Sequence, residues 1–280
     1  MNRLLIFGLG YSGRAVAEAA AGFAVMATTR GAPGPGMVAF EDAGSAIATA
    51  THILITAAPG PDGDPVLARY ADEIEASETA RWIGYLSSTV VYGNRDGGWV
   101  DEDTRPMPTQ ARGRVRLEAE RAWGRCGMGR AVDIFRLAGI YGPGRSAFDD
   151  LRSGTARRTI KPGHAFGRIH RDDIGRAVAA AMRSGVGPGL RVFNLADDEP
   201  SESAAVVEEA ARIMGVRPPP AVAFADMEAG MSPMARSFWA ENRKVASAKT
   251  QAALGLRWLY PNFRAGLAAI WREETGQGPA

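Results

Sequence analysis

The chain has few of the side chains that bind metals or form covalent bridges. Its 280 residues include one cysteine, Cys126, and three histidines, His52, His164 and His170. A single cysteine excludes an internal disulfide and is typical of a reducing compartment, so we expect a cytoplasmic protein. The histidines are far apart in the sequence and lack ligand spacing, and the sequence therefore predicts no metal site.

Long apolar runs are also absent. No stretch approaches the roughly 18 apolar residues that a membrane helix needs, so no membrane span is expected. The opening LLIFGLG is interrupted by glycines and soon followed by Arg14 and Glu18. This pattern favours a buried first strand over a signal segment.

Lysine is scarce, and the positive charge rests almost entirely on arginine. Only Lys161, Lys244 and Lys249 occur, and the net charge is +2. The basic residues form no continuous stripe, so the sequence does not indicate nucleic-acid binding.

A glycine-rich turn follows the first apolar run. Residues 3–7 read as a strand, Gly8-Leu9-Gly10-Tyr11-Ser12-Gly13 as a turn, and RAVAEAA as the start of a helix. In this context G-x-G-x-x-G predicts dinucleotide binding: Gly8 permits the turn, Gly10 the approach of a pyrophosphate, and Gly13 close helix packing. The helix N-terminus attracts the phosphate charge. The alternative is a glycine turn without a ligand.

The end of the second strand bears on the choice of dinucleotide. The run FAVMATTR ends at Thr29 and Arg30, and no acidic residue occurs between Glu18 and Glu41. An acidic side chain here suits the 2′-hydroxyl of NAD, whereas an arginine suits the 2′-phosphate of NADP. We therefore expect Thr29 and Arg30 to bind NADP, with NAD as the alternative cofactor. In the simpler interpretation Arg30 ends a strand in water.

Strands and helices alternate through the first third of the chain. We expect helices at 43–50 and 65–80, and strands at 52–56 and 82–86. Repeated strand–helix units predict an α/β fold with a doubly wound parallel (Rossmann) sheet that binds ligands at the carboxyl ends of its strands. The small residues Ala57, Ala58 and Pro59 follow one such end, where an adenosine ribose is expected.

Several segments resemble one enzyme family. Ser87-Ser88-Thr89-Val90-Val91-Tyr92-Gly93 and the early GLGYSG resemble the extended short-chain dehydrogenase/reductase family, which includes NAD(P)-dependent sugar-nucleotide epimerases and dehydratases. FRLAGIYGPG, RIHRDDIGRAV, VFNLADDEPSE and ALGLRWLYPNFRAGL continue the likeness in the family's order. The resemblance implies a Rossmann domain of 1–142 plus about 168–197, and a small discontinuous C-terminal substrate lobe of about 143–167 plus 198–280. It also implies a homodimer through the helices at 65–80 and 110–126.

The resemblance assigns roles beside the strand at 82–86. Ser88 matches the catalytic Ser/Thr of the family and would hydrogen-bond the reacting oxygen of the substrate, with Thr89 beside it. Ser87 and Tyr141 would lie near the nicotinamide. Val90 stands where family dehydratases carry an acidic residue, so a typical dehydratase is not expected. The alternative is that Ser88 and Thr89 simply end a strand.

The family's Tyr-x-x-x-Lys pair is missing from this chain. In ARGRVRLEAE, Arg112 stands at the tyrosine position and Arg116 at the lysine position, and none of the six tyrosines has a lysine four residues later. Arg116 keeps a positive charge and donors for a ribose, but a guanidinium at 112 stays protonated and cannot cycle as general acid and base. Arg112 either stabilises a developing alkoxide or is a surface residue.

The C-terminal part offers weaker signals. Arg145, Arg236 and Arg243 are candidate ligands of a substrate diphosphate. The run MEAGMSPMARSFWAENRKVAS is rich in Met and aromatic residues and lines a substrate pocket or fills the lobe core. An aspartate of Asp172-Asp173 is expected to cap the helix that follows His170.

Two functions are compatible with this sequence. The first is an NAD(P)-dependent oxidoreductase or epimerase acting on a hydroxyl or carbonyl of a sugar-nucleotide-like small molecule. The second is a catalytically weak or inactive NADP(H)-binding or sensing protein that regulates a partner.

Overall fold

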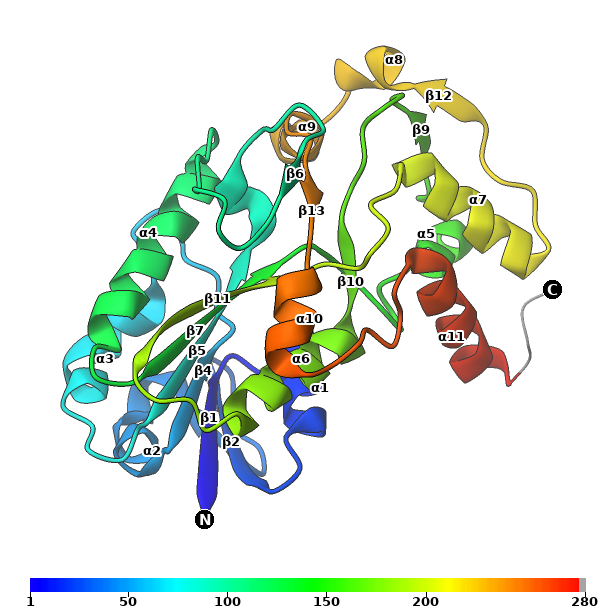
Figure 1. Cartoon of the computed structure of the whole chain (residues 1–280). Coiled ribbons are helices and arrows are strands. Elements are labelled where there is room, and N and C mark those ends of the chain that lie inside the picture. The colour runs from blue at the N-terminus through cyan, green and yellow to red at the C-terminus, as the bar shows by residue number, and fades with distance from the viewer. Residues whose placement is uncertain (277–280) are drawn as a thin grey trace.

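A parallel sheet of seven strands forms the centre of the molecule (Figure 1), whose computed structural model describes residues 1–276 apart from the side chain of Met234. The strands are β1 (Asn2–Phe7), β2 (Phe23–Thr29), β3 (Met37–Ala39), β4 (His52–Ile55), β5 (Trp82–Ser88), β7 (Ala131–Leu137) and β11 (Gly189–Leu195). Their order is β11-β7-β5-β4-β1-β2-β3, and every neighbouring pair is parallel. The chain winds outward from β1 to β3 and then continues on the other side of β1, which leaves a crevice at the carboxyl ends of β1 and β4.

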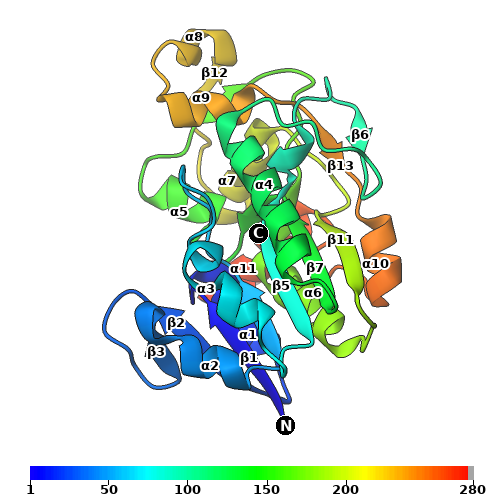
Figure 2. The same cartoon turned by 90° about the vertical axis from the view of Figure 1, so that its left-hand side faces the viewer.

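Helices cover both faces of this sheet. They are α1 (Tyr11–Ala19), α6 (Arg171–Arg183) and α10 (Ala248–Leu254) on one face, and α2 (Gly44–Thr49), α3 (Pro65–Glu75) and α4 (Ala111–Cys126) on the other. Within β1, Leu4 and Ile6 join the core under α1 and α6, whereas Leu5 and Phe7 join the core under α2 and α3. Figure 2 shows α4 lying across β5 and β7. Burial on both faces explains why these strands are continuous apolar runs.

The remaining elements gather at one end of the sheet as a C-terminal lobe. It contains α5 (Ala147–Arg152), β9 (Arg158–Ile160), α7 (Ser203–Met214), β12 (Ala221–Ala223), α8 (Phe224–Glu228), α9 (Pro233–Trp239) and α11 (Phe263–Thr275). Phe148, Ile213, Phe263 and Leu267 belong to its separate apolar core. The lobe boundaries expected from the sequence stay a prediction, and their last residues, 277–280, lie outside the described residues.

Short parallel strand pairs join the lobe and the sheet. β6 (Trp99–Val100) pairs with β13 (Lys244–Val245), and β8 (Gly139–Tyr141) pairs with β10 (Arg168–His170). These pairs bring distant segments together at the carboxyl edge of the sheet. Two single-turn 3₁₀ helices, η1 (Phe40–Asp42) and η2 (Thr89–Tyr92), complete the elements.

The predicted fold class is confirmed, but three local features differ from what the sequence indicated. The helix expected at 65–80 ends at Glu75, and β3 was not expected at all. The third concerns α6, whose N-cap is His170: its Nδ1 accepts from the amide of Asp172 at 3.3 Å. Asp173 instead accepts from the amides of Leu259 and Tyr260, at 2.9 and 3.0 Å. The carboxylate of Asp173 therefore bonds to a distant segment of the chain and does not cap α6.

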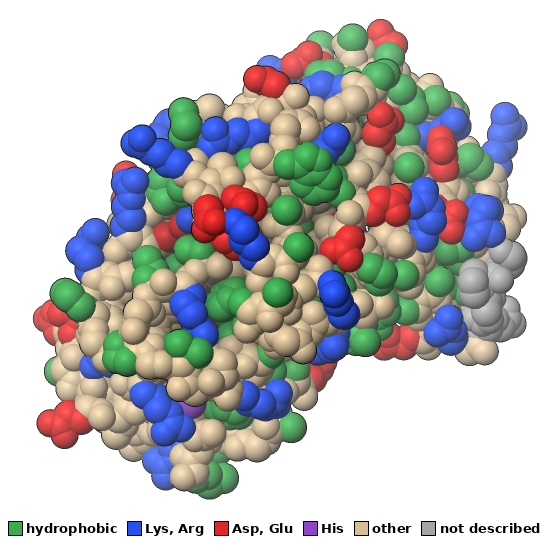
Figure 3. Space-filling model, viewed as in Figure 1, with side chains coloured by type: hydrophobic (Ala, Val, Ile, Leu, Met, Phe, Trp, Pro, Cys, Tyr) green, Lys and Arg blue, Asp and Glu red, His purple; other side chains and the backbone are tan. Residues whose placement is uncertain are grey.

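The surface agrees with the mixed charge of the sequence. On the face shown in Figure 3, Lys and Arg side chains are interspersed with Asp and Glu. Within the described residues, no helix is both long and apolar enough to cross a membrane.

Helix α1 packs so closely on α6 that a glycine is needed at the contact. A Cβ at Gly175 would lie 2.5 Å from the carbonyl oxygen of Ala15, a backbone atom that cannot swing away. We expect Gly175→Ala to lower the free energy of unfolding by about 1–3 kcal/mol in urea denaturation, because overpacking outweighs the gain in helix propensity. Gly124→Ala on α4 is the control: its Cβ would meet only Leu190 at 3.7 Å, and equal destabilisation of both variants would contradict the prediction.

Candidate active site

Two neighbouring cavities lie at the carboxyl edge of the sheet. The larger, about 1330 Å³, is walled by the start of α1, the ends of β5 and β7, the first turns of α4 and the segment from α9 to β13. Its lining contains the sequence-predicted residues Gly10, Tyr11, Ser12, Gly13, Pro59, Ser87, Ser88, Thr89, Arg112, Arg116, Tyr141 and Arg145. The smaller, about 410 Å³, is lined by Gly8, Leu9, Thr29, Arg30 and Ala57 among others. Ala58 lies on the turn between Ala57 and Pro59, and Arg236 lines neither cavity.

The glycine turn leaves the start of α1 open to a ligand. Gly8 has a φ of +98°, and a Cβ at Gly13 would lie 2.5 Å from the Gly8 carbonyl oxygen, so both positions require glycine. A Cβ at Gly10, by contrast, meets nothing within 4 Å, and no side chain caps the helix N-terminus. Open space beside uncapped amides is the arrangement that binds a pyrophosphate, so the residues fit a dinucleotide.

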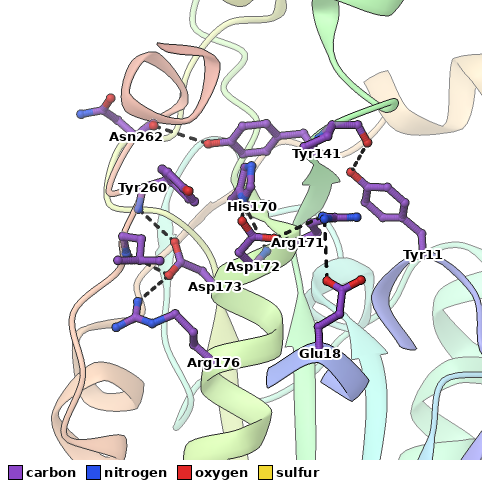
Figure 4. A network of polar contacts seen from close by, with 12 residues as sticks. Tyr11, Glu18, Tyr141, His170, Arg171, Asp172, Asp173, Arg176, Tyr260 and Asn262 are labelled. Carbon is purple, nitrogen blue, oxygen red and sulfur yellow. Dashed lines mark hydrogen bonds and ion pairs between the residues drawn. The ribbon is translucent and has the colours of Figure 1, made fainter. Parts of the chain in front are cut away.

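Tyr11 connects this turn to the loop that follows β8. Its hydroxyl donates to the carbonyl of Pro143 at 3.0 Å (Figure 4), and burial raises the pKa of Tyr11 to about 12. A Cβ at Gly142 would lie 2.5 Å from the Tyr11 hydroxyl. The guanidiniums of Arg145 and Arg171 lie 5.7 and 5.6 Å from the tyrosine ring. Arg145 adds positive charge to the lining of the larger cavity, whereas Arg171 is paired with Asp172 at 3.2 Å and with Glu18 at 3.8 Å.

The smaller cavity contains both a basic and an acidic side chain. Arg30 is exposed at the end of β2, and the Thr29 hydroxyl accepts from the amide of Gly31 at 3.0 Å. Glu41, which the sequence analysis placed beyond the relevant segment, lines the same cavity, with its carboxylate 3.7 Å from Arg69. The pairing of β2 with β3 brings Glu41 back to this edge of the sheet.

The three hydroxyl residues at the end of β5 all line the larger cavity. Ser88 Oγ accepts from the amide of Val90 at 3.3 Å and caps η2. Ser87 Oγ donates to Glu120 Oε1 at 2.5 Å. Ser88 therefore has a structural role and also faces the cavity, so the two sequence interpretations are compatible.

A buried ion pair fixes α4 against the sheet. Arg136 of β7 contacts both carboxylate oxygens of Glu120, at 3.1 and 2.8 Å, and each side chain is about 5% exposed. Arg136 also donates to the Tyr92 hydroxyl at 3.0 Å, which donates to Asn194 at 2.7 Å. This network was not predicted from the sequence.

The two arginines at the positions of the family's tyrosine and lysine lie on the same face of α4 as Glu120. Arg116 is half-buried and donates to the carbonyl of Leu86 at 2.9 Å, next to the hydroxyl residues of β5. Arg112 is half-buried, donates to the Ser237 carbonyl at 3.4 Å and lies 4.3 Å from the Phe238 ring centre. Burial lowers the pKa of Arg112, opposed by the charge of Glu241. Arg112 therefore faces the cavity and helix α9 rather than open solvent.

The α9 end of the larger cavity contains Arg243, one of the three arginines proposed from the sequence as diphosphate ligands, together with residues that the sequence did not indicate. Glu241 and Arg243 both line it, as do Phe238 and Trp239. Arg168, the first residue of β10, also lines the larger cavity. Sequence analysis could not find the acidic and basic pair, because the surrounding run reads as Met- and aromatic-rich core. Within residues 1–276, no group of three or more His, Cys, Asp and Glu side chains could hold a metal ion.

Two proteins are similar to this chain in sequence. Protein YeeZ of Escherichia coli K12 is 30% identical over 191 residues, which are 66% of this chain and 67% of that protein. A functionally unknown conserved protein from Silicibacter pomeroyi DSS is 42% identical; the match covers 98% of this chain and 100% of that one, with a TM-score of 0.88. No family model matches the chain.

Two further solved structures share the fold at lower identity. Human epimerase family protein SDR39U1 with NADPH has a TM-score of 0.79 at 18% identity, covering 96% of this chain and 98% of that one. MoeE5 in complex with UDP-glucose and NAD has a TM-score of 0.74 at 20% identity, covering 99% and 100%. At these identities the likeness shows the fold alone.

The open space beside Gly10 gives a direct test of the cradle. Gly10→Ala should fold as stably as the wild type, because its φ of −79° suits alanine and the new methyl meets no protein atom. It should bind NADPH about tenfold or more weakly in calorimetric titration, because the methyl intrudes where phosphate oxygens would meet backbone amides. Gly44→Ala, equally free of contacts, is the control. Unchanged NADPH affinity in Gly10→Ala would contradict the assignment.

Proposed function

Since the chain belongs to the extended short-chain dehydrogenase/reductase family, as an NAD(P)-dependent epimerase/dehydratase-like member without the Tyr-x-x-x-Lys dyad, we propose that it is an NADP-dependent oxidoreductase or epimerase. Its substrate would be a sugar-nucleotide-like small molecule with a reacting hydroxyl or carbonyl.

One observation carries this proposal: a single cavity is lined by the uncapped start of α1 and by the hydroxyls at the end of β5. A dinucleotide whose phosphates meet α1 can extend its nicotinamide toward Ser88 within this cavity. The fold therefore brings together a place for the cofactor and polar groups for a reacting oxygen.

The choice of NADP rests on the smaller cavity. Arg30 lines it beside Gly8 and Leu9, where the adenosine ribose is expected, and a guanidinium is suited to a 2′-phosphate. Glu41 in the same lining supports the alternative cofactor, NAD, because its carboxylate could accept a hydrogen bond from the 2′-hydroxyl of the ribose. We prefer NADP because Glu41 already has Arg69 as a salt-bridge partner at 3.7 Å.

In this proposal the side chains at the cavity orient the substrate and stabilise charge. Bound NADP(H) would supply or accept the hydride at the reacting carbon. Ser88 and Thr89 would hydrogen-bond the reacting oxygen, and Arg116 would donate to the nicotinamide ribose. Arg112 would stabilise the alkoxide electrostatically, while water or the substrate itself provides the proton. Losing a positioned general acid costs about a hundredfold to ten-thousandfold in rate, so we expect slow turnover.

The proposed substrate class is supported by the positive charge of the cavity lining and by a solved structure with the same fold. Arg145 lines the cavity on the loop held by Tyr11, and a guanidinium there suits the diphosphate of a nucleotide sugar. The structure of MoeE5 with UDP-glucose is an example of this fold with such a ligand.

A second candidate function is a weakly active or inactive NADP(H)-binding protein that regulates a partner. It is favoured by one observation: a guanidinium occupies the position of the family's proton donor. Both candidates require the dinucleotide, so binding alone does not separate them.

Cofactor selectivity tests the role of Arg30. Arg30→Ala should weaken NADPH binding about tenfold and change NADH binding less than twofold, because only NADPH carries the 2′-phosphate that loses a charged hydrogen bond. Arg3→Ala removes the same charge from the opposite edge of the sheet and is the control. Equal losses for the two dinucleotides in Arg30→Ala would sink the 2′-phosphate assignment.

Turnover separates the two candidate functions. With a panel of keto sugars and nucleotide sugars, we expect slow oxidation of NADPH whose kcat/KM falls about a hundredfold in Ser88→Ala, the loss typical of removing one donor to a developing oxyanion. Ser45→Ala, exposed on α2, is the control. NADPH binding with no turnover of any panel member would favour the regulatory function.

A further inference from the structure

We propose that the α9 end of the larger cavity is an oxyanion subsite, in which Arg112 and Arg243 bind a carboxylate or phosphate group of the ligand in competition with the carboxylate of Glu241. The inference rests on the proposed function, because the molecule that carries this carboxylate or phosphate is the substrate proposed for the same cavity. It adds the chemical group that the cavity recognises next to the reacting centre, at the position where the family keeps its tyrosine.

Arg243 is fixed in the wall of this subsite. It donates from one terminal nitrogen to Glu241 Oε2 at 2.7 Å and to the Gly93 carbonyl at 3.0 Å. Its side chain is 14% exposed and that of Glu241 is 3% exposed. The second carboxylate oxygen of Glu241 accepts from the Thr109 hydroxyl at 2.6 Å. Both partners are thus held by neighbouring segments of the chain.

Arg112, on α4, lies within reach of the electrostatic field of the same carboxylate, which raises the pKa of Arg112 against the effect of burial. The first turn of α4 packs on η2, as a Cβ at Gly113 would lie 3.1 Å from the Val90 carbonyl oxygen. The Phe238 ring and the Ser237 carbonyl hold the Arg112 guanidinium at the cavity wall. A cation–π contact of this kind fixes a guanidinium without neutralising its charge.

Positive charge exceeds negative charge in the cavity lining. Its described lining contains one carboxylate, Glu241, and five arginines: Arg112, Arg116, Arg145, Arg168 and Arg243. Burial lowers the pKa of Arg243, and the nearby Arg112 and Arg95 lower it further, opposed by Glu241. Arg112 and Arg243, which are both partly buried, therefore favour the binding of an anion, because the low local dielectric strengthens the attraction.

The neighbouring walls are aromatic. Phe238 lines the cavity with 53% of its surface exposed, and Trp239 lies next to it. A ligand with an apolar or planar part beside its oxyanion can therefore place that part on these rings and its charge on the guanidiniums.

A purely structural salt bridge between Arg243 and Glu241 predicts a different response to mutation. If Glu241 only braces the wall, its removal cannot strengthen the binding of an anion. If the carboxylate of Glu241 competes with the ligand for the guanidiniums of Arg112 and Arg243, removing that carboxylate must strengthen the binding of the anion.

Titration of the NADPH-saturated protein with inorganic phosphate and with malonate tests the subsite. Binding is followed by tryptophan fluorescence at constant ionic strength. We expect Arg112→Gln to weaken binding of the preferred probe about tenfold or more, as the loss of a charge-assisted hydrogen bond implies. We expect Glu241→Gln to strengthen it severalfold. Arg121→Gln, an exposed arginine of the same helix, should change it less than twofold. Which probe binds more tightly identifies the oxyanion as phosphate or carboxylate.

Arg243→Gln alone leaves Glu241 buried without its guanidinium and risks unfolding. The double variant Arg243→Gln/Glu241→Gln removes both charges, should fold, and should lose binding about tenfold or more. Unchanged probe affinity in Arg112→Gln, or no strengthening in Glu241→Gln, overturns the proposal.

Failure of the proposed function has a different signature. If NADPH does not bind, the same titrations on the protein without it still compare wild type with Arg112→Gln, and an Arg112-dependent affinity supports the subsite. If NADPH binds but the Arg112 and Glu241 variants match the wild type, only the subsite is refuted.

Discussion

The reversal of winding between β1 and β4 is the constraint on which the site depends. It leaves the carboxyl end of β1 without a covering crossover, and the chain turns into α1 there through Gly8, whose φ of +98° favours glycine. Contact of Gly13 with the Gly8 carbonyl holds α1 near β1, so its first amides face the crevice. The smaller and larger cavities lie on either side of this one turn.

Helix α4 is the second fixed element of the site. The buried pair of Glu120 and Arg136 joins α4 to β7, and the hydroxyl of Ser87 joins it to β5. Helical spacing then presents Arg116 and Arg112 to the cavity one and two turns earlier. Where the family's pattern has a proton donor on this face, the chain has permanent positive charge, which suits the recognition of anions better than the movement of protons.

Local patterns were sufficient to predict the start of the fold. The glycine spacing after β1 predicts the turn and α1, because its requirements are set by backbone geometry within a few residues. β3 was missed because Met37–Ala39 is only three residues long and becomes a strand through pairing with β2. The partners of Asp173 and the closeness of Glu241 to Arg112 were also missed, because contacts across the chain leave no periodic signal. The glycines of the turn were therefore predictable, whereas at the α9 end, apart from Arg112 on α4, only Arg243 was.

The buried carboxylate of Asp173 has a consequence for how the chain folds. It is buried in α6, and its backbone partners at Leu259 and Tyr260 lie 86 and 87 residues later. Within α6 itself, Asp173 also accepts from Arg176, three residues later, at 2.8 Å. The contacts with Leu259 and Tyr260 close late, since loop entropy opposes them until the rest is ordered. A chain ending before Leu259 would keep α6 and its carboxylate but lose the amides that satisfy it.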